Sequence, residues 1–383
     1  MKPRSLLILL ALALTAFPLN AASVDRSPKD TLSADGPYIL YGMDGGARVI
    51  SVDTSGNISD DFLDPFPDNY TFLVTDHRGE YPFEVSLRPF AREDWHIPSA
   101  NARTFVMSDP HGRLDCVVSL LQGNRVIDKD LRWSYGTDRL IVIGDICDRG
   151  YDVTSIYWLF YKLQQEAREA GGAVTMLLGN HEPMLFAGDE RYAKPKYTVL
   201  ARLLGMKYKD LMGPDSELGR WIASWNVISV IGSNLYVHAG LGKDFYDWNL
   251  PVAEINAKMS EALFMKNSAR KAASDTLKFL FGSYGPIWYR GLVSEKPSRR
   301  PLAADSLALI RQRFGVDHII VGHTIFRDVS TFYDGQVIDV NVDNRVNRRK
   351  NRGRALLIDN GQYIVVGDRG KKRNLKLNQQ LPH

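Results

Sequence analysis

The chain has 383 residues, of which 44% are hydrophobic and 24% are charged, a composition typical of a soluble globular protein. This length is sufficient for one large domain and a smaller appendage. The formal net charge is +4, and two of these charges belong to Lys2 and Arg4, in a segment that we expect to be removed. The remaining charge is too small for a general nucleic-acid binder, so no specific nucleic-acid partner is expected.

Residues 1–22 have the pattern of a secretory signal peptide: basic residues, then an apolar run at 6–17, then small residues. The run is short for a bilayer span, although an uncleaved membrane anchor is the alternative interpretation. No other stretch is apolar enough to cross a membrane. The mature chain is therefore expected to begin at Ala22 or Ser23, to contain no integral membrane segment, and to be exported to the periplasm or secreted.

Two cysteines, Cys116 and Cys147, are too few for a disulfide framework in an exported protein. Free, partly buried thiols are the preferred interpretation. A single bridge between the two is the alternative, because the sequence does not show whether they are close in space.

Residues 23–37 are polar and contain Pro and Gly, which predicts a flexible lead-in, and residues 38–100 predict a small β-rich module of unknown role. The acidic, proline-containing stretch at 60–68 is predicted to be a loop. The strands expected in the module are 38–41, 48–52, 72–75 and 83–87.

From residue 101 to about residue 370, strands and helices alternate, which predicts a large α/β domain. The first part reads as β-α-β-α-β and predicts parallel strands with right-handed crossovers. Two helical regions, 185–225 and a second ending near 281, are expected between later strands. The predicted strands are 104–107, 140–143, 174–178, 227–231, 235–237, 319–321, 337–340, 355–358 and 363–366, and the predicted helices of the first part are 114–121 and 155–170.

Basic residues crowd two short stretches, 348–354 and 371–373, and the second belongs to a predicted basic tail at 371–383. A solvated loop and tail are the usual meaning of such runs. A patch that attracts anionic partners is the alternative.

Polar motifs follow five of the predicted strands, at the points where the strands end. Ligands of open α/β sheets bind at the carboxyl ends of the strands, so these motifs are expected to converge. Each motif is weak by itself, since a lone His at a strand end is more often a hydrogen-bonded core residue. The string Gly-Asp-x-x-Asp-Arg-Gly is the exception, because it is rare by chance. The motifs are Ser108-Asp109-Pro110-His111-Gly112, Gly144-Asp145-Ile146-Cys147-Asp148-Arg149-Gly150, Gly179-Asn180-His181-Glu182, His238-Ala239-Gly240 and Gly322-His323-Thr324.

In this order, the motifs resemble those of the calcineurin-like metallophosphoesterases and, within them, the PPP phosphatases. The Gly-Pro-Ile-Trp-Tyr-Arg-Gly segment at 285–291 further resembles the Shewanella-like (Shelph) branch. The resemblance covers residues 104–367 and implies the family's β-sandwich flanked by helices. Three residues depart from the pattern without removing a side chain that the chemistry needs: Ser108, Pro110 and Ala239.

The resemblance implies a pair of metal ions. Asp109 and His111 would hold the first ion, and Asp145 would bridge both. Two divalent ions carry more charge than two carboxylates cancel, and the surplus suits a phosphate dianion and lowers the pKa of a shared water. Mixed Asp, Asn and His donors suit manganese, iron and zinc alike. The second ion would complete its ligands with Asn180, His238 and His323.

Four further residues are expected to act on the substrate. Arg149 would direct a bidentate guanidinium at the phosphate oxygens. Arg290 is expected to be a second phosphate clamp because its Arg-Gly context resembles the family, with a salt bridge as the alternative. His181 does not match a ligand position and is interpreted as the general acid that protonates the leaving oxygen, oriented by Asp148.

Two neighbours of these residues have less specific interpretations. Glu182 is expected either to support the ligands or simply to begin the helix after the third strand. Cys147 lies inside a motif, but a cysteine-nucleophile mechanism lacks its phosphate loop here and conflicts with hard oxygen and nitrogen ligands.

The leading hypothesis is a metal-dependent phosphomonoesterase, in which a metal-bridging hydroxide attacks phosphorus in line. By resemblance, its substrate is a phosphorylated protein (Ser/Thr or Tyr), with a small-molecule phosphoester as the broader class. Similar motifs occur in symmetrical dinucleoside polyphosphate hydrolases, so a nucleotide hydrolase is the alternative, although export favours the first hypothesis. A non-catalytic binding module would require the loss of a ligand or of the acid, and none is lost.

Overall fold

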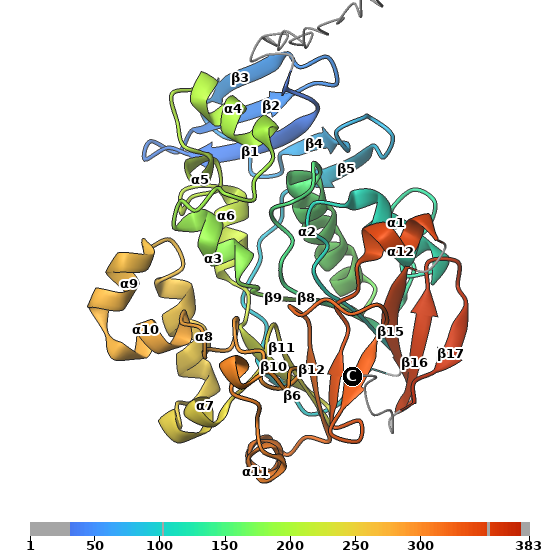
Figure 1. The fold of residues 1–383 in the computed structure, drawn as a ribbon. Coiled ribbons are helices and arrows are strands. Elements are labelled where there is room, and N and C mark those ends of the chain that lie inside the picture. The colour runs from blue at the N-terminus through green and yellow to red at the C-terminus, as the bar shows by residue number, and fades with distance from the viewer. Residues whose placement is uncertain (1–30, 102, 351–352, 377–383) are drawn as a thin grey trace, which may run out of the picture.

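Two six-stranded sheets form the centre of the molecule (Figure 1). The computed structural model describes residues 31–101, 103–350 and 353–376, so the predicted signal peptide lies outside the described residues. In spatial order, the first sheet contains β17 (Lys372–Asn374), β16 (Gln362–Gly367), β15 (Arg354–Asp359), β7 (Arg103–Met107), β8 (Arg139–Ile143) and β9 (Ala173–Leu177). The second sheet contains β13 (Ser330–Phe332), β14 (Val337–Asp339), β12 (His318–Val321), β11 (Asn234–Val237), β10 (Ile228–Ile231) and β6 (His96–Ile97).

The strands of the first sheet that carry the early motifs are parallel. β7 pairs with β8, and β8 pairs with β9, in the same direction. Their connections contain α1 (Leu114–Gly123) and α2 (Val153–Glu169). The predicted β-α-β-α-β run of parallel strands is therefore confirmed. In the second sheet, β11, β12 and β14 are also parallel to one another.

Alternate residues of each strand enter different cores. Val106 and Ile141 belong to a buried cluster that includes Ile320 of the other sheet, so this cluster lies between the sheets. Phe105 and Val142 point the opposite way, into the larger core that contains the helices. Successive side chains of a strand face opposite sides, and burial on both sides explains why these strands read as continuous apolar runs. The expected β-sandwich flanked by helices is confirmed.

The N-terminal part of the described chain is β-rich. The three-stranded antiparallel sheet comprises β1 (Asp35–Tyr41), β2 (Ala47–Val52) and β3 (Ile58–Leu63), and a separate hairpin comprises β4 (Thr71–Val74) and β5 (Phe83–Ser86). The last three residues of the predicted lead-in, 35–37, belong to β1.

The loop predicted at residues 60–68 is wrong in its first part, because residues 60–63 belong to β3. Among the described strands, β3 lies at the edge of its sheet and pairs with β2 alone. Its middle residues are exposed, and Asp60 forms an ion pair of 2.7 Å with Arg48 of β2. An exposed edge strand shows no apolar alternation in the sequence, and charge on such an edge discourages pairing with other chains.

The N-terminal sheet packs against α2, the helix that follows the Arg149 motif. The indole of Trp158 donates a hydrogen bond of 2.9 Å to the Pro37 carbonyl. The Tyr38 and Thr154 hydroxyl oxygens lie 3.1 Å apart, and both side chains are buried. Because these contacts fix α2 from its outer side, the N-terminal residues stabilise the helix that follows a loop of the site.

Two groups of helices interrupt the chain after β9 and after β11, as predicted, but the second group extends beyond its predicted end near residue 281. Those that follow β9 are α3 (His181–Phe186), α4 (Pro195–Leu203), α5 (Tyr208–Leu211) and α6 (Glu217–Ala223). Those that follow β11 are α7 (Lys243–Trp248), α8 (Val252–Glu261), α9 (Asn267–Ala273), α10 (Asp275–Leu280) and, after the short 3-10 helix η2 (Pro297–Arg299), α11 (Ala304–Phe314).

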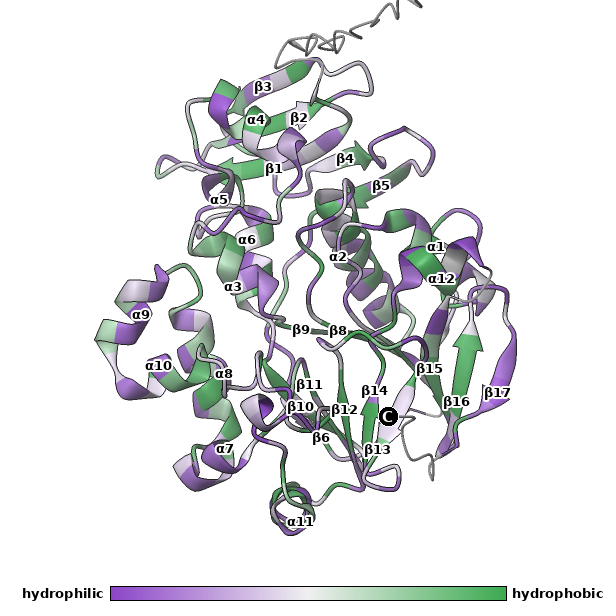
Figure 2. Ribbon diagram, viewed as in Figure 1, coloured by the Kyte–Doolittle hydropathy of each residue, from purple (hydrophilic) through white to green (hydrophobic). Residues whose placement is uncertain are grey.

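The basic stretches interpreted as loop and tail are partly ordered elements. Residues 348–349 close α12 (Asn344–Arg349), and residues 372–373 lie in β17. Asp343 accounts for the start of this helix, because its side chain accepts a hydrogen bond of 3.0 Å from the Val346 amide and so caps the first turn. β17 pairs with β16 at the sheet edge, where it is visibly more hydrophilic than β16 (Figure 2).

No helix in the described ranges combines the length with the apolar character that a bilayer span requires.

Candidate metal centre

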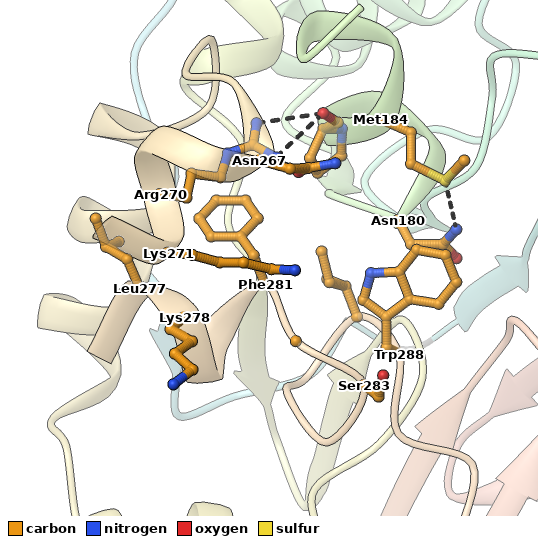
Figure 3. Close-up of a pocket in the computed structure, with 13 residues that line it drawn as sticks. Asn180, Met184, Asn267, Arg270, Lys271, Leu277, Lys278, Phe281, Ser283 and Trp288 are labelled. Carbon is orange, nitrogen blue, oxygen red and sulfur yellow. Dashed lines mark hydrogen bonds between the residues drawn. The ribbon is translucent and has the colours of Figure 1, made fainter. Parts of the chain in front are cut away.

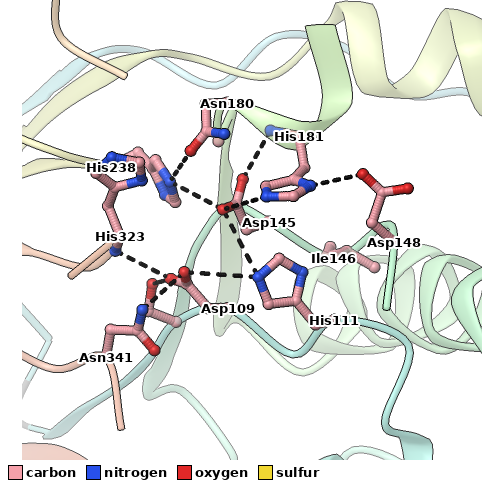
Figure 4. Close-up of polar contacts among 12 residues, drawn as sticks. Asp109, His111, Asp145, Ile146, Asp148, Asn180, His181, His238, His323 and Asn341 are labelled. Atoms are coloured by element: carbon pink, nitrogen blue, oxygen red, sulfur yellow. Dashed lines mark hydrogen bonds and ion pairs between the residues drawn. The ribbon is translucent and has the colours of Figure 1, made fainter. Parts of the chain in front are cut away.

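Side chains from the five motifs lie together at one place (Figure 4). Asp109 follows β7, Asp145 follows β8 and Asn180 follows β9, while His238 and His323 follow β11 and β12 of the second sheet. The predicted convergence at the carboxyl ends of the strands is therefore observed, and it draws on both sheets of the sandwich.

The backbone at this place takes a conformation that non-glycine residues rarely adopt. φ is positive at Asp109 (50°), His111 (47°), Asp145 (55°) and His323 (65°). Such residues cost free energy and concentrate at functional sites, where surrounding structure holds them in place. Strained backbone at four of the six predicted ligands is consistent with a site selected for the position of its side chains.

Asp145 is the centre of the cluster. Its Oδ2 atom lies 3.2 Å from His238 Nε2, and 3.9 Å from the Nε2 atoms of His111 and His181. Two groups of metal-ligand type share this carboxylate: one joins it to His111 and His181, the other to His238 and His323. A carboxylate common to two groups is the arrangement that a bridging ligand requires.

The first half of the centre holds Asp109 and His111. Asp109 Oδ2 lies 3.9 Å from His111 Nε2 and accepts a hydrogen bond of 2.8 Å from the Asn341 amide. The Nδ1 atom of His111 lies 2.8 Å from the Cys147 carbonyl oxygen, so its Nε2 atom faces the carboxylates. A partner on the far ring nitrogen is the usual way to orient a histidine ligand.

The second half of the centre orients its histidine in the same way. His238 Nδ1 lies 2.7 Å from the Ile143 carbonyl oxygen, and its Nε2 atom lies 3.1 Å from Asn180 Oδ1. The Nε2 atom of His323 is buried and has no hydrogen-bond partner in the described part of the chain. A buried imidazole nitrogen without a partner is costly unless a ligand binds it. The donors present, including this unsatisfied nitrogen, fit divalent metal ions.

Charge reinforces this fit. Burial raises the pKa of Asp145, but the surrounding histidines outweigh burial and hold its pKa well below the usual range. Burial, together with the neighbouring Asp145 charge, raises the pKa of Asp109 to about 7. Burial and the nearby His238 keep the pKa of His323 well below its usual value, so this ring is neutral, as a metal ligand must be.

His181 and Asp148 form a separate pair beside the ligands. His181 Nδ1 lies 2.5 Å from Asp148 Oδ2, and both side chains are buried. Burial lowers the pKa of His181, but the Asp145 charge and the Asp148 hydrogen bond outweigh it, and the net pKa is raised. The pair therefore favours the protonated form of the imidazole and leaves its Nε2 atom facing Asp145.

The two predicted phosphate clamps lie in different surroundings. Arg149 is exposed, and its guanidinium lies 4.9 Å from the centre of the Tyr192 ring. Arg290 is half-buried and donates to the His323 carbonyl (3.2 Å) and the Thr324 hydroxyl (2.8 Å). The salt bridge considered for Arg290 is not found among the described residues, so its charge remains available beside a predicted ligand.

Glu182 does more than begin α3. Its fully buried carboxylate accepts hydrogen bonds from the backbone N–H groups of Asp145 (3.2 Å), Ile146 (2.8 Å) and Gly179 (3.0 Å). Burial raises its pKa, and the Asp145 charge adds to this shift. The side chain thus joins the loops after β8 and β9, and so supports the ligands that these loops carry.

Asn341 was missed in the sequence, although it holds Asp109 directly. It lies just after β14, at the same edge as the other motifs. The rule that found the other residues, a polar side chain after a buried strand, would also have selected it. It lacked a surrounding motif of its own.

The thiol groups of the two cysteines are not among the proposed ligands. Cys116 and Cys147 are both buried, and no disulfide joins them. Burial raises the pKa of Cys147 well above the ordinary value, which suppresses the thiolate that a cysteine nucleophile would need.

Two cavities flank the centre. One, of about 530 Å³, is lined by Asp109, His111 and Arg149. The other, of about 260 Å³, adjoins Asn180 and is lined by the Trp288 ring and by Arg270, whose guanidinium donates to the Pro183 carbonyl (Figure 3). Both offer space beside the predicted ligands for a substrate group.

Comparison with known proteins gives the chain its family. A family model described as calcineurin-like phosphoesterase matches residues 102–326, which contain all six predicted ligands. The chain belongs to this family. It is therefore a hydrolase that acts on phosphoester bonds. The family uses a binuclear metal centre, and the His and Asp clusters around Asp145 are of a kind that could hold metal ions.

Individual relatives are phosphatases. The crystal structure of a cold-active protein-tyrosine phosphatase from a psychrophilic Shewanella species is 31% identical, with a TM-score of 0.80, over 89% of this chain and 99% of that one. Shewanella-like protein phosphatase 2 of Arabidopsis thaliana is 26% identical over 58% of this chain and 66% of its own length. Shewanella-like protein phosphatase 1 of Plasmodium berghei is 23% identical over 58% and 61%, so the chain spans about two thirds or less of these two relatives.

Proposed function

We propose that this calcineurin-like phosphoesterase is a metal-dependent protein phosphatase, with phosphotyrosine among its substrates. The observation that carries the proposal is the similarity to the Shewanella protein-tyrosine phosphatase over nearly the whole of that chain. The cavity of about 530 Å³ beside His111 and Arg149 supports it, because it leaves room for a side chain that enters with its phosphate first.

The ligands proposed for the two metal ions are those gathered around Asp145. When bound, divalent ions would supply Lewis-acid stabilisation of phosphoryl oxygens and would lower the pKa of a coordinated water. Manganese, iron and zinc all accept this donor set, and manganese is the first ion to test. The proposed ligands are Asp109, His111, Asp145, Asn180, His238 and His323.

The remaining residues act on the substrate. Arg149 and Arg290 bind non-bridging phosphoryl oxygens with their guanidinium groups. His181 donates the proton on Nε2 to the leaving oxygen, because a serine alkoxide leaves poorly without one. Asp148 binds Nδ1 of the same ring at 2.5 Å, which fixes the ring and favours the charged form.

A substrate panel tests the proposed function. The purified mature protein, supplied with manganese, is expected to hydrolyse phosphotyrosine and phosphoserine peptides with larger kcat/KM values than diadenosine tetraphosphate. Initial rates for the three substrates decide the result. Faster turnover of the dinucleotide would instead favour the nucleotide hydrolase.

We also propose that the protein is exported. The proposal rests on the signal-peptide pattern at residues 1–22, outside the described residues. N-terminal sequencing or intact mass of native protein is expected to show a chain that begins at Ala22 or Ser23. A native chain that begins at Met1 would disprove export by cleavage.

A further inference from the structure

A groove leads away from the metal centre along α1 and α12, which lie side by side (Figure 1). Its inner part is the cavity of about 530 Å³ that adjoins Asp109 and His111. Its outer part is a second cavity of about 320 Å³. The two share Arg113, Cys116 and Arg345 in their walls, so they are neighbours on one surface.

The walls of this groove are strongly basic, whereas the whole chain is nearly balanced, with 48 basic and 44 acidic residues. Four acidic residues line it, and one of these, Asp109, is a proposed metal ligand; the others are Asp115, Asp343 and Asp368. The basic residues are Arg78, Arg113, Arg149, Arg191, Lys194, Arg345, Arg349 and Arg369.

For half of these cations, the described residues provide neither an ion pair nor an aromatic ring contact. Arg191 pairs with Asp189 at 2.5 Å and Arg78 approaches Glu80 at 4.0 Å. Within the described ranges, by contrast, no ion pair is found for four arginines of the groove: Arg113, Arg345, Arg349 and Arg369. Unpaired cations in a concave surface concentrate a positive potential, which attracts anionic ligands.

These arginines are held by structure and do not project from an unstructured tail. Arg345 and Arg349 are four residues apart on α12, and therefore lie on one face of the helix. Asn347, buried beneath that helix, donates to the Arg327 carbonyl at 3.1 Å. Arg369 is carried by the turn between β16 and β17, which closes through the amide of Gly367 and the Lys371 carbonyl at 2.8 Å.

We propose that this groove binds a second anionic group of the phosphorylated substrate, an acidic segment that flanks the phosphoresidue. The proposal rests on the proposed protein phosphatase function and extends it to substrate selection. The phosphate to be hydrolysed occupies the metal end, near Arg149, and the flanking anions lie along Arg345, Arg349 and Arg369. Carboxylates and a second phosphate share the required chemistry.

Three matched phosphotyrosine peptides test the groove. Their flanks carry either glutamate, glutamine at the same positions, or glutamine with one phosphoserine. The wild-type protein is expected to show a kcat/KM roughly 10-fold higher for the glutamate peptide than for the glutamine peptide, as a few exposed ion pairs provide. The advantage should shrink as salt is added, because salt screens exposed charges.

Arg349→Gln/Arg369→Gln is the informative variant, because both residues line only the outer cavity. It should lose roughly 5-fold in kcat/KM on the glutamate peptide, since each exposed ion pair contributes only modestly to binding. Activity on the glutamine peptide and on para-nitrophenyl phosphate should not change. Arg168→Gln/Arg202→Gln removes the same charge from exposed helix positions outside both cavities, and should change nothing.

The outcomes distinguish carboxylates from a second phosphate as the bound group. They also distinguish failure of the groove proposal from failure of the proposed protein phosphatase function. An advantage for both charged peptides assigns the groove to carboxylates, and an advantage for the phosphoserine peptide alone assigns it to a second phosphate. Equal kcat/KM values for all three peptides in the wild type would overturn the proposal that the groove binds flanking anionic groups. Hydrolysis of para-nitrophenyl phosphate but of no peptide would overturn the protein phosphatase function, and the groove with it.

Discussion

Replacement of Asp145 by asparagine is expected to reduce phosphatase activity by about 10³-fold or more. Asp145 is the carboxylate common to both groups of ligand-type side chains. Its loss removes a charge from both proposed ion positions, and several kcal/mol of transition-state stabilisation depend on those ions. Initial rates on a phosphotyrosine peptide and on para-nitrophenyl phosphate measure the effect, which should be similar for both substrates.

A control separates this effect from a general loss of charge. Asp60→Asn removes a carboxylate from the exposed edge strand β3, where it pairs with Arg48. It should retain wild-type activity. A far-ultraviolet circular dichroism spectrum and melting curve check that Asp145→Asn is folded, and a folded variant with full turnover would show that Asp145 does not bridge.

Variants of His181, the proposed acid, and of Arg290, the proposed phosphate clamp, are expected to respond differently to the leaving group of the substrate. His181→Asn should lose roughly 10²–10⁴-fold on a phosphoserine peptide, because the serine alkoxide needs the proton. The loss should be distinctly smaller on para-nitrophenyl phosphate, whose phenolate leaves readily without one. Metal content should be unchanged, since the His181 ring is proposed to bind Asp148 and not an ion.

Arg290→Ala provides the contrast. It removes the positive charge that is proposed to bind the non-bridging phosphoryl oxygens. Both esters present these oxygens, so the loss of activity should be similar for the two. Single-turnover rates are required where chemistry does not limit the steady state. Equal losses for His181→Asn on the two esters, or a loss of bound metal in that variant, would contradict its assignment as the acid.

The parts of this site that could be predicted from sequence are those that local pattern determines. Fully buried parallel strands read as apolar runs, and a polar residue at the end of each run, such as Asp109 or His323, identifies the edge at which ligands meet. The rare string around Asp145 then distinguished a functional site from hydrogen-bonded core residues.

Other features depend on tertiary contacts that a local pattern does not contain. Residues 60–63 of the strand β3 were predicted as a loop, because an exposed edge strand loses its apolar alternation. The helix α12 depends on the cap from Asp343, within a run that reads as solvated charge. Asn341 supports Asp109 across 232 residues of sequence, and nothing near it in the chain indicates that contact.

The most direct test of the account is the number of metal ions bound per chain. Elemental analysis of protein reconstituted with manganese and freed of excess ion should give two ions per chain for the wild type. Asp145→Asn, prepared in the same way, should bind fewer ions, with both positions weakened because the bridging carboxylate serves both. Two tightly bound ions in Asp145→Asn, or full wild-type activity with no bound ion, would contradict a centre built on Asp145.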